Sequence, residues 1–175
     1  MRKSLDWLYT GSGVLAGVFL VLIAVLSLSQ IGGRTFGFAA YSFDDFAGFC
    51  MAASSFLGLA HTYRRNEQIR VALVIDRFSG GTRRVLEAVC LTASTFLIGF
   101  FAAYAIDMVW TSYEINDVSQ GLVPVPLWLP QGGMALGLII MTVALFDDLV
   151  AVLAGGTASY IAVEQSKKLA MSENL

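Results

Sequence analysis

The sequence predicts an all-α integral membrane protein, a four-helix bundle whose two termini both lie on the cytoplasmic side. Three observations predict it. The 175 residues are 57% hydrophobic and only 14% charged, whereas about 25% of the residues of a soluble domain are charged. Four long segments contain no charged residue, and nearly all basic residues lie at one set of their ends. Too few polar side chains remain to cover a water-facing surface, so most of the surface faces lipid.

The charge-free segments are long enough to form transmembrane helices. They comprise residues 7–33, 46–63, 88–106 and 118–146. A helix needs about 20 mainly apolar residues to cross a bilayer, and lipid offers backbone groups no partner outside a helix. We place the crossings near residues 11–32, 45–63, 86–109 and 131–153. They form one transmembrane domain over residues 1–163, and residues 164–175 form a polar cytoplasmic tail.

The first span follows Arg2 and Lys3, which would suit the basic start of a signal peptide. Its apolar segment is too long for a cleaved signal, and no A-x-A site follows it. We therefore expect an uncleaved signal-anchor helix.

Aromatic residues lie near the ends of three predicted spans. They are Trp7, Tyr9, Trp110, Tyr113 and Trp128. Amphipathic rings favour the headgroup level, so they predict an aromatic belt, with Trp128 as an interfacial contact. The alternative is that they are ordinary packing residues.

Polar residues gather where the first span ends and the second begins. Gln30 and Arg34 are four residues apart on one helix face, and Asp44 and Asp45 open the second span. A contact between Arg34 and Asp45 would neutralise both charges and join two helices. It would also place a carboxylate at a helix N-terminus, where the helix dipole favours it. We predict this pair; the alternative is two solvated charges at the interface.

The basic residues determine the predicted orientation. Ten of the eleven lie before the first span, in the connector of residues 64–84, or in the tail, and the remaining one is Arg34. With four crossings, those three segments share one side. Lys and Arg are retained on the cytoplasmic side, so we expect an N-in, C-in topology. The net charge of -2 argues against nucleic acid as a partner.

The connector also predicts an interfacial amphipathic helix over residues 66–79. In helical register, its apolar residues fall on one face, and Arg70 and Arg77 fall on the opposite side. Such a helix lies along the inner leaflet, with Arg64, Arg65, Arg70 and Arg77 as contacts to lipid phosphates. The alternative is a short linker whose arginines only set the topology.

Acidic residues lie near both membrane surfaces. Asp107 shares a helix face with Trp110 and Glu114, late in the third span. It faces either a partner or a cavity, or it lies close enough to the outer interface to stay hydrated. Near the inner interface, the connector arginines could balance Glu87, Asp147 and Asp148. The candidate partner contacts are Gln30, Asp107, Glu114 and Asp117.

The sequence predicts no reactive site. His61 is the only histidine, and a transmembrane b-type haem requires two on facing helices; no Ser-His-Asp arrangement, HExxH, Walker loop or GxGxxG occurs. Cys50 and Cys90 each lie inside an apolar segment and are expected to be buried free thiols. We expect no catalytic residue, no metal and no cofactor, and therefore no enzyme.

Small residues four positions apart predict close helix packing, because they let two backbones approach each other in lipid. The pairs are Gly13 with Gly17, Ser54 with Gly58, and Gly133 with Gly137.

Four sequence motifs follow one another along the chain. Gln30-x3-Arg34 closes the first span, and an acid opens the second. Arg64-Arg65-Asn66-Glu67-Gln68-Ile69-Arg70-Val71 follows the second span, and Gly121…Pro126-x-Trp128-x-Pro130 precedes the fourth. Over roughly residues 10–155 this pattern resembles the small membrane subunit (DctQ-type) of tripartite ATP-independent periplasmic (TRAP) transporters.

The chain departs from that family at several positions. The family typically has Gly-Glu-His-Ile-x-Val-Asp in the connector, where this chain has Asn66, Gln68 and Ala72 in place of Gly, His and Asp. It has Phe43-Asp44-Asp45 where the family has Trp-x-x-Glu, and the family's arginine near Phe49 is absent. These changes put functional carry-over at those positions in doubt but leave the topology intact.

The resemblance implies an accessory subunit in the bacterial inner membrane. In such systems a large membrane subunit carries the substrate and sodium, and a soluble periplasmic protein captures the substrate, commonly an organic acid such as a carboxylate, a sialic acid or an ectoine. The small subunit braces the large one and helps to form the docking surface. The outer loop from Glu114 to Gln131, with its three prolines, is then a candidate docking surface; alternatively, the prolines only stiffen a turn.

Two other functions compete with this one. A self-contained small multidrug-type exporter would need an acid deep in a helix, and Asp107 lies off-centre. A redox membrane anchor binding haem or quinone is disfavoured by the single histidine.

Overall fold

The structure is a computed structural model, and it describes residues 2–37, 42–65 and 81–154. Side chains are described for residues 7–37, 42–65 and 85–154. The predicted interfacial helix over residues 66–79, with Arg70 and Arg77, lies outside the described residues, as does the tail over residues 164–175.

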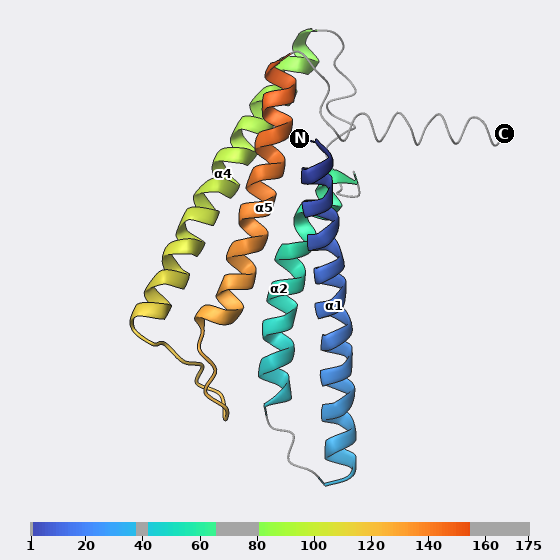
Figure 1. Ribbon diagram of the computed structural model, residues 1–175, viewed down its shortest axis with the longest axis vertical. Coiled ribbons are helices and arrows are strands. Elements are labelled where there is room, and N and C mark those ends of the chain that lie inside the picture. The colour runs from blue at the N-terminus through green and yellow to red at the C-terminus, as the bar shows by residue number, and fades with distance from the viewer. Residues whose placement is uncertain (1, 38–41, 66–80, 155–175) are drawn as a thin grey trace, which may run out of the picture.

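Four helices make up nearly all of the described chain (Figure 1). They are α1 (Arg2–Thr35), α2 (Phe43–Arg64), α4 (Gly81–Glu114) and α5 (Trp128–Leu153). Each contains one of the predicted spans, so the all-α class is confirmed. The helices extend beyond the predicted crossings, α1 most of all, because polar and aromatic residues continue the helical backbone past the apolar segment.

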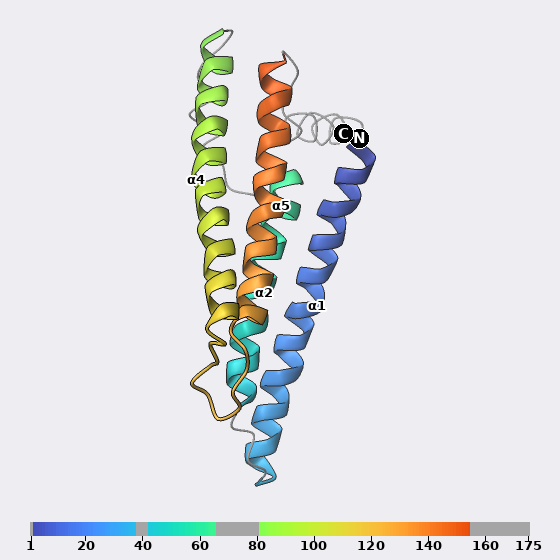
Figure 2. The same cartoon turned by 60° about the vertical axis from the view of Figure 1, so that its left-hand side comes forward.

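The four helices form a row in the order α1, α2, α5, α4. The main packing contacts are between α1 and α2, α2 and α5, and α5 and α4 (Figures 1 and 2). The most apolar window of α1 is only 6% buried and that of α4 17% buried, against 44% for α5. The outer helices α1 and α4 therefore have wide apolar flanks that the other described helices do not cover.

Successive helices run in opposite directions. The start of α1, the end of α2, the start of α4 and the end of α5 share one end of the row, which we call the Arg64 end (Figure 1). The loop of residues 115–127 lies at the opposite end, which we call the loop end. This alternation places both ends of the helical domain on one side, as predicted; that this side is cytoplasmic stays a prediction.

Three of the described helices are long and apolar enough to cross a membrane: Trp7–Thr35, Val85–Glu114 and Trp128–Leu153. The 22 residues of α2 are not in this set. Two acids in its first turn and His61 and Arg64 in its last turn lower its apolar character. It has a length of about 33 Å at 1.5 Å per residue, enough for a hydrocarbon core of about 30 Å. Its neighbours α1 and α5 cover it, so it presents less surface to lipid.

Small residues bring α2 close to both neighbours. A side-chain carbon at Gly137 would collide with the backbone of Phe56, so α5 and α2 touch there through their main chains. On the other side of α2, the hydroxyl of Ser54 donates to the carbonyl oxygen of Ala16 over 2.9 Å. Packing by the predicted small residues is thus confirmed for these positions, whereas a Cβ added at Gly17 would meet no atom of another helix within 4 Å.

Two predictions about single residues are wrong. Cys50 is buried, as expected, but Cys90 is exposed, because its side chain lies on the part of α4 that α5 does not cover. Tyr9, expected in an aromatic belt, is 1% exposed and belongs to the core. Trp7, Trp110 and Tyr113 are exposed, as a belt requires.

Candidate functional site

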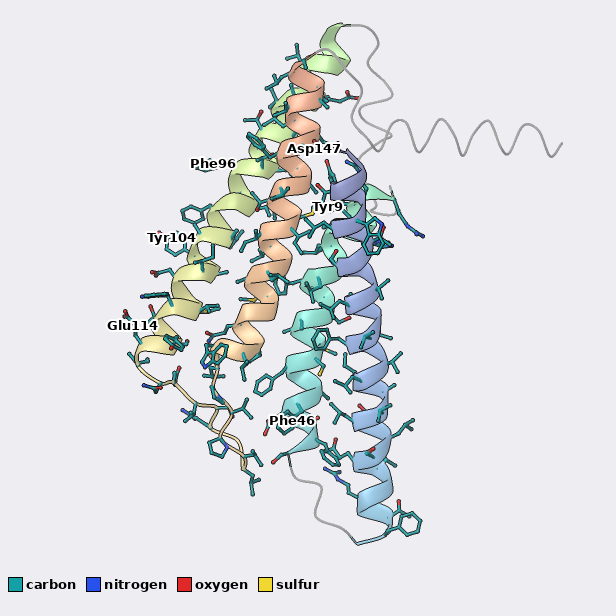
Figure 3. All side chains as sticks on the ribbon, viewed as in Figure 1. Tyr9, Phe46, Phe96, Tyr104, Glu114 and Asp147 are labelled. Carbon is teal, nitrogen blue, oxygen red and sulfur yellow. The ribbon has the colours of Figure 1, made fainter. Side chains whose placement is uncertain are left out.

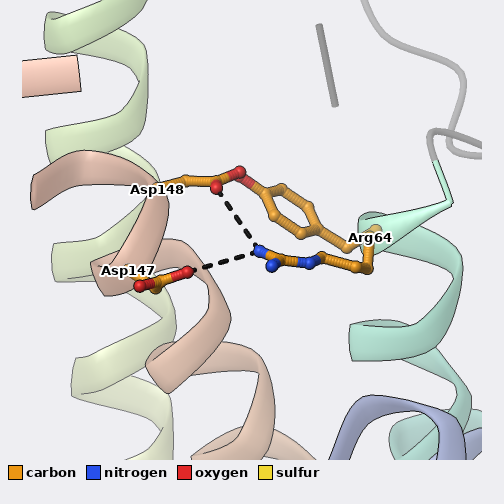
Figure 4. Close-up of polar contacts among 4 residues, drawn as sticks. Arg64, Asp147 and Asp148 are labelled. Carbon is orange, nitrogen blue, oxygen red and sulfur yellow. Dashed lines mark hydrogen bonds and ion pairs between the residues drawn. The ribbon is translucent and has the colours of Figure 1, made fainter. Parts of the chain in front are cut away.

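A charged cluster joins α2 to α5 at the Arg64 end (Figure 4). Nη1 of Arg64 lies 3.3 Å from Oδ2 of Asp147 and 3.7 Å from Oδ1 of Asp148. The hydroxyl of Tyr63 donates to Oδ2 of Asp148 over 3.0 Å. The side chains of Arg64 and Asp148 are only 15% and 1% exposed. A buried carboxylate needs both a counter-charge and hydrogen bonds, and this arrangement supplies both.

The first helix closes the same cluster from the other side. The guanidinium carbon of Arg64 lies 5.2 Å from the centre of the Tyr9 ring, at cation–π distance. The carbonyl oxygen of Tyr9 accepts a hydrogen bond from Ser12 Oγ over 2.9 Å and lies 3.1 Å from Nδ1 of His61. His61 fits there because Gly13 has no side chain: a Cβ at Gly13 would collide with the imidazole.

The cluster is suited to fixing helices and not to chemistry. The guanidinium of Arg64 contacts two carboxylates, and Asp148 also accepts the Tyr63 hydrogen bond, so these groups are already engaged with one another. Within the described residues, no group of three or more His, Cys, Asp and Glu residues could hold a metal ion. Arg64 was predicted to contact lipid phosphates. Its side chain instead points inward and contacts Asp147 and Asp148. The suggestion that a connector arginine balances these two acids is confirmed for Arg64. Arg65 is exposed.

At the loop end, the structure does not bring Arg34 and Asp45 together. Both side chains are exposed, and the ion pairs among the described residues do not include this one. The predicted helix-pinning contact is therefore absent from the described part of the chain. Asp45 lies instead against Gly121 of the 115–127 loop, where any Cβ would collide with its carboxylate. The ion pair that joins two helices is at the opposite end of the row.

The loop between α4 and α5 has an ordered, hairpin-like backbone. Val118 and Pro126 form an antiparallel bridge, and the NH of Ser119 donates to the carbonyl of Val125 over 2.8 Å. The NH of Leu127 donates to the carbonyl of Asp117 over 3.0 Å. The tip is apolar and open to solvent, with Leu122 75% and Val123 47% exposed. The loop that was predicted as a docking surface is therefore folded as a hairpin-like turn.

The other candidate contacts are divided between the two edges of the row. Gln30 is half-buried on α1, whereas Asp107 and Glu114 are exposed on α4. Asp117 lies in the loop. Figure 3 shows Phe96, Tyr104 and Glu114 on the side of α4 that faces away from α5.

Aromatic side chains mark the loop end of α4 and α5. Trp128 is 37% exposed, and its ring packs edge-on against Tyr113 with centroids 6.0 Å apart. Nε1 of Trp110 donates to Oε1 of Glu114 over 2.9 Å. Indole and phenol rings favour the membrane interface, and the position of these rings at the interface stays a prediction.

One comparison decides which family this fold and these sites represent. The family model described as "Tripartite ATP-independent periplasmic transporters, DctQ component" matches residues 23–155, well over half of the chain. The chain belongs to the DctQ family. The comparisons with curated proteins and with solved structures gave no match.

Membership in the DctQ family explains why the described part of this membrane protein contains no cluster of reactive residues. A DctQ protein is the small membrane component of a TRAP transporter and not an enzyme, which replaces the exporter and redox-anchor alternatives. The matched residues include Arg64, Asp107, Asp147 and Asp148 but begin after Tyr9 and Ser12. The α2–α5 ion pair thus lies within the DctQ match, and the α1 side of the cluster lies before it.

Neither the charged cluster nor the hairpin stood out as a unit in the sequence. Tyr63 and Tyr9 carry no motif, and only their position beside Arg64 in three dimensions gives them a role. The one usable signal was the pair Asp147-Asp148 after a long apolar segment, because two adjacent acids at a membrane-helix end require a cation nearby.

Proposed function

We propose that this DctQ chain is the accessory subunit of a sodium-coupled TRAP transporter that imports organic acids across the bacterial inner membrane. It braces the large transport subunit and helps to dock the periplasmic substrate-binding protein. The observation that carries the proposal is the DctQ match over residues 23–155. In this orientation the Arg64 end faces the cytoplasm and the loop end faces the periplasm.

The internal contacts support a bracing role. A subunit that moves its substrate across the membrane needs a neighbour that stays in place. The Arg64 cluster fixes three helices at one end of the row, and the backbone contact at Gly137 fixes α2 to α5 nearer the other end. These contacts resist sliding of the helices, while the uncovered flanks of α1 and α4 remain available to a partner.

The hairpin supports a docking role. It is ordered by its own hydrogen bonds, it contacts α2 through Gly121, and it presents Leu122 and Val123 outward. An exposed apolar tip on an ordered turn is a surface that a partner protein can cover.

Deletion of this chain tests the proposal. In a strain that retains the large subunit and the binding protein, uptake of the organic acid is expected to fall to background. Capture of the acid by the periplasmic protein should persist. The full-length chain should also copurify with the large subunit in mild detergent. Solute transport by the purified chain alone in liposomes, or unchanged uptake after its deletion, would contradict the proposal.

A further inference from the structure

One carboxylate lies on the uncovered side of α4. The helix packs on α5 through a face that includes Ala102 and Ala105. On the opposite face, exposed residues recur at alternating spacings of four and three, which places them in one line along a helix. We call this line the outer α4 stripe. It consists of Phe96, Phe100, Ala103, Asp107, Trp110 and Glu114.

The position of Asp107 along α4 places it below the membrane surface. Tyr113 and Trp128 pack together at the level of the predicted aromatic belt. The indole of Trp110 donates a hydrogen bond to Glu114, one helical turn closer to the loop end. Asp107 precedes Tyr113 by six residues, about 9 Å at 1.5 Å per residue. The distance from the aromatic belt to the hydrocarbon layer is shorter than this. An exposed carboxylate at this depth is unfavourable in lipid and marks a contact with another group.

The described part of the chain offers no cation near Asp107. The sequence contains no Lys, Arg or His between Arg84 and Lys167. Arg34 and Arg64 belong to α1 and α2, and neither of these helices is among the main packing neighbours of α4. The pairing group for Asp107 must therefore come from outside this part of the chain.

The opposite edge of the row differs in chemistry. The exposed residues of α1 within the membrane are mainly aliphatic, with Val18, Val21 and Leu28 among the most exposed. Residues 7–33 contain no charge. Such a surface suits lipid acyl chains. The α4 edge instead has large rings, with Phe96 at 75% and Tyr104 at 60% exposure, together with a carboxylate. Aromatic residues are enriched in protein interfaces.

We propose that the outer α4 stripe is the surface that docks on the large transport subunit, with Asp107 paired to an arginine or lysine on a transmembrane helix of that subunit. This proposal rests on the accessory function proposed above. Phe96 and Phe100 supply the apolar contact area, and Ala103 lets the partner helix approach α4 next to the charge. The charge pair fixes the register of the two helices, while α1 faces lipid.

The experiment uses the full-length chain coexpressed with the large subunit, with a photo-crosslinking phenylalanine analogue placed singly at two positions. One is Ala103 on the stripe. The control is the exposed Ala24 on α1, which precedes Thr35 by the same number of residues as Ala103 precedes Glu114. We expect crosslinks to the large subunit from position 103 and lipid adducts from position 24. The opposite pattern would overturn the choice of face while leaving the accessory function intact. A crosslink from position 103 to a second copy of this chain, or to lipid only, would also overturn it.

Charge variants test the pairing itself. Asp107→Asn is expected to lower copurification of the large subunit about tenfold, because the partner cation is left unpaired in the interface. Asp107→Glu should retain most of it, and Glu114→Gln, which changes a carboxylate nearer the membrane surface, should retain all of it. If the Asp107→Asn variant copurifies the large subunit as well as the wild-type chain does, the proposed charge pair is overturned. Failure of the wild-type chain to copurify would instead contradict the proposed function.

Discussion

The hydroxyl of Tyr63 donates a hydrogen bond to Asp148 over 3.0 Å, across 85 positions of the sequence. This contact belongs to the α2–α5 interface at the centre of the row. Both residues are almost fully buried, at 4% and 0% exposure. Asp148 therefore depends on Tyr63 and Arg64 for groups that stabilise its charge, and the stability of the central helix pair should depend on the same contacts.

Tyr63→Phe is expected to lower the free energy of unfolding by about 1–3 kcal/mol, the cost of leaving a buried acceptor short of a hydrogen bond. Thermal unfolding in detergent, followed by tryptophan fluorescence, measures this. Tyr104→Phe removes a hydroxyl from a ring that is 60% exposed and should leave the unfolding temperature unchanged. Equal stability of the two variants would show that Asp148 does not need the Tyr63 hydroxyl.

Arg64→Gln should destabilise the protein more strongly, by about 3–5 kcal/mol, because it removes a cation that contacts the buried Asp148 carboxylate. Asp148→Asn removes one of the two carboxylate charges that Arg64 contacts. In a double-mutant cycle, the two substitutions together should cost clearly less than the sum of the single ones. Strict additivity in the measured unfolding free energies would indicate that the pair is not energetically coupled.

Gly137→Ala is expected to destabilise the α2–α5 contact by about 1–3 kcal/mol, since overpacking forces backbones apart. The new methyl group would meet the backbone of Phe56. Gly132→Ala is a matched control on the same helix, because no atom lies within 4 Å of the added carbon. A stability scan in which both variants behave like the wild type would argue against close backbone packing at Gly137.

Membrane orientation can be tested by labelling with a thiol reagent that does not cross the membrane. In a chain whose Cys50 and Cys90 have been replaced by serine, Gln120→Cys at the loop end should be labelled from the periplasm. Arg65→Cys at the Arg64 end should be labelled only after the inner membrane is permeabilised. Labelling of both cysteines from the same side would refute a membrane crossing by α4 and with it the topology of four crossings.

The hairpin tip gives a test of docking. Leu122→Ser changes a side chain that is 75% exposed, so folding and copurification with the large subunit should be unaffected. Uptake at limiting concentrations of the periplasmic binding protein should fall several-fold and recover when that protein is in excess. Ile115→Ser, at 67% exposure but at the base of the loop, serves as the control. An identical dependence on binding protein for both variants and the wild type would exclude the tip from docking.

Part of the candidate site was predictable from sequence. Asp107, Glu114 and the loop between α4 and α5 were chosen as candidate contacts because charge and proline stand out in an apolar chain, and their contacts with a partner stay predictions. The Arg34–Asp45 pair was wrong as a contact in the described structure, because closeness in sequence and opposite charge do not fix how two helix ends splay. The role of Tyr9 was missed because its burial depends on α1 packing over Arg64, which no local pattern reveals.

The sequence by itself determined the helices and the alternation of their directions. Lipid forces each apolar segment to satisfy its own backbone hydrogen bonds, so length and hydropathy are sufficient to locate helices. Only the tertiary structure decided the order α1, α2, α5, α4 and which faces stay uncovered. An apolar face gains little by leaving lipid for protein, so helix neighbours depend on close fit and on polar contacts. The backbone contact at Gly137 and the pairing of Arg64 with Asp148 are properties of that fit, and they exist only once the helices have packed.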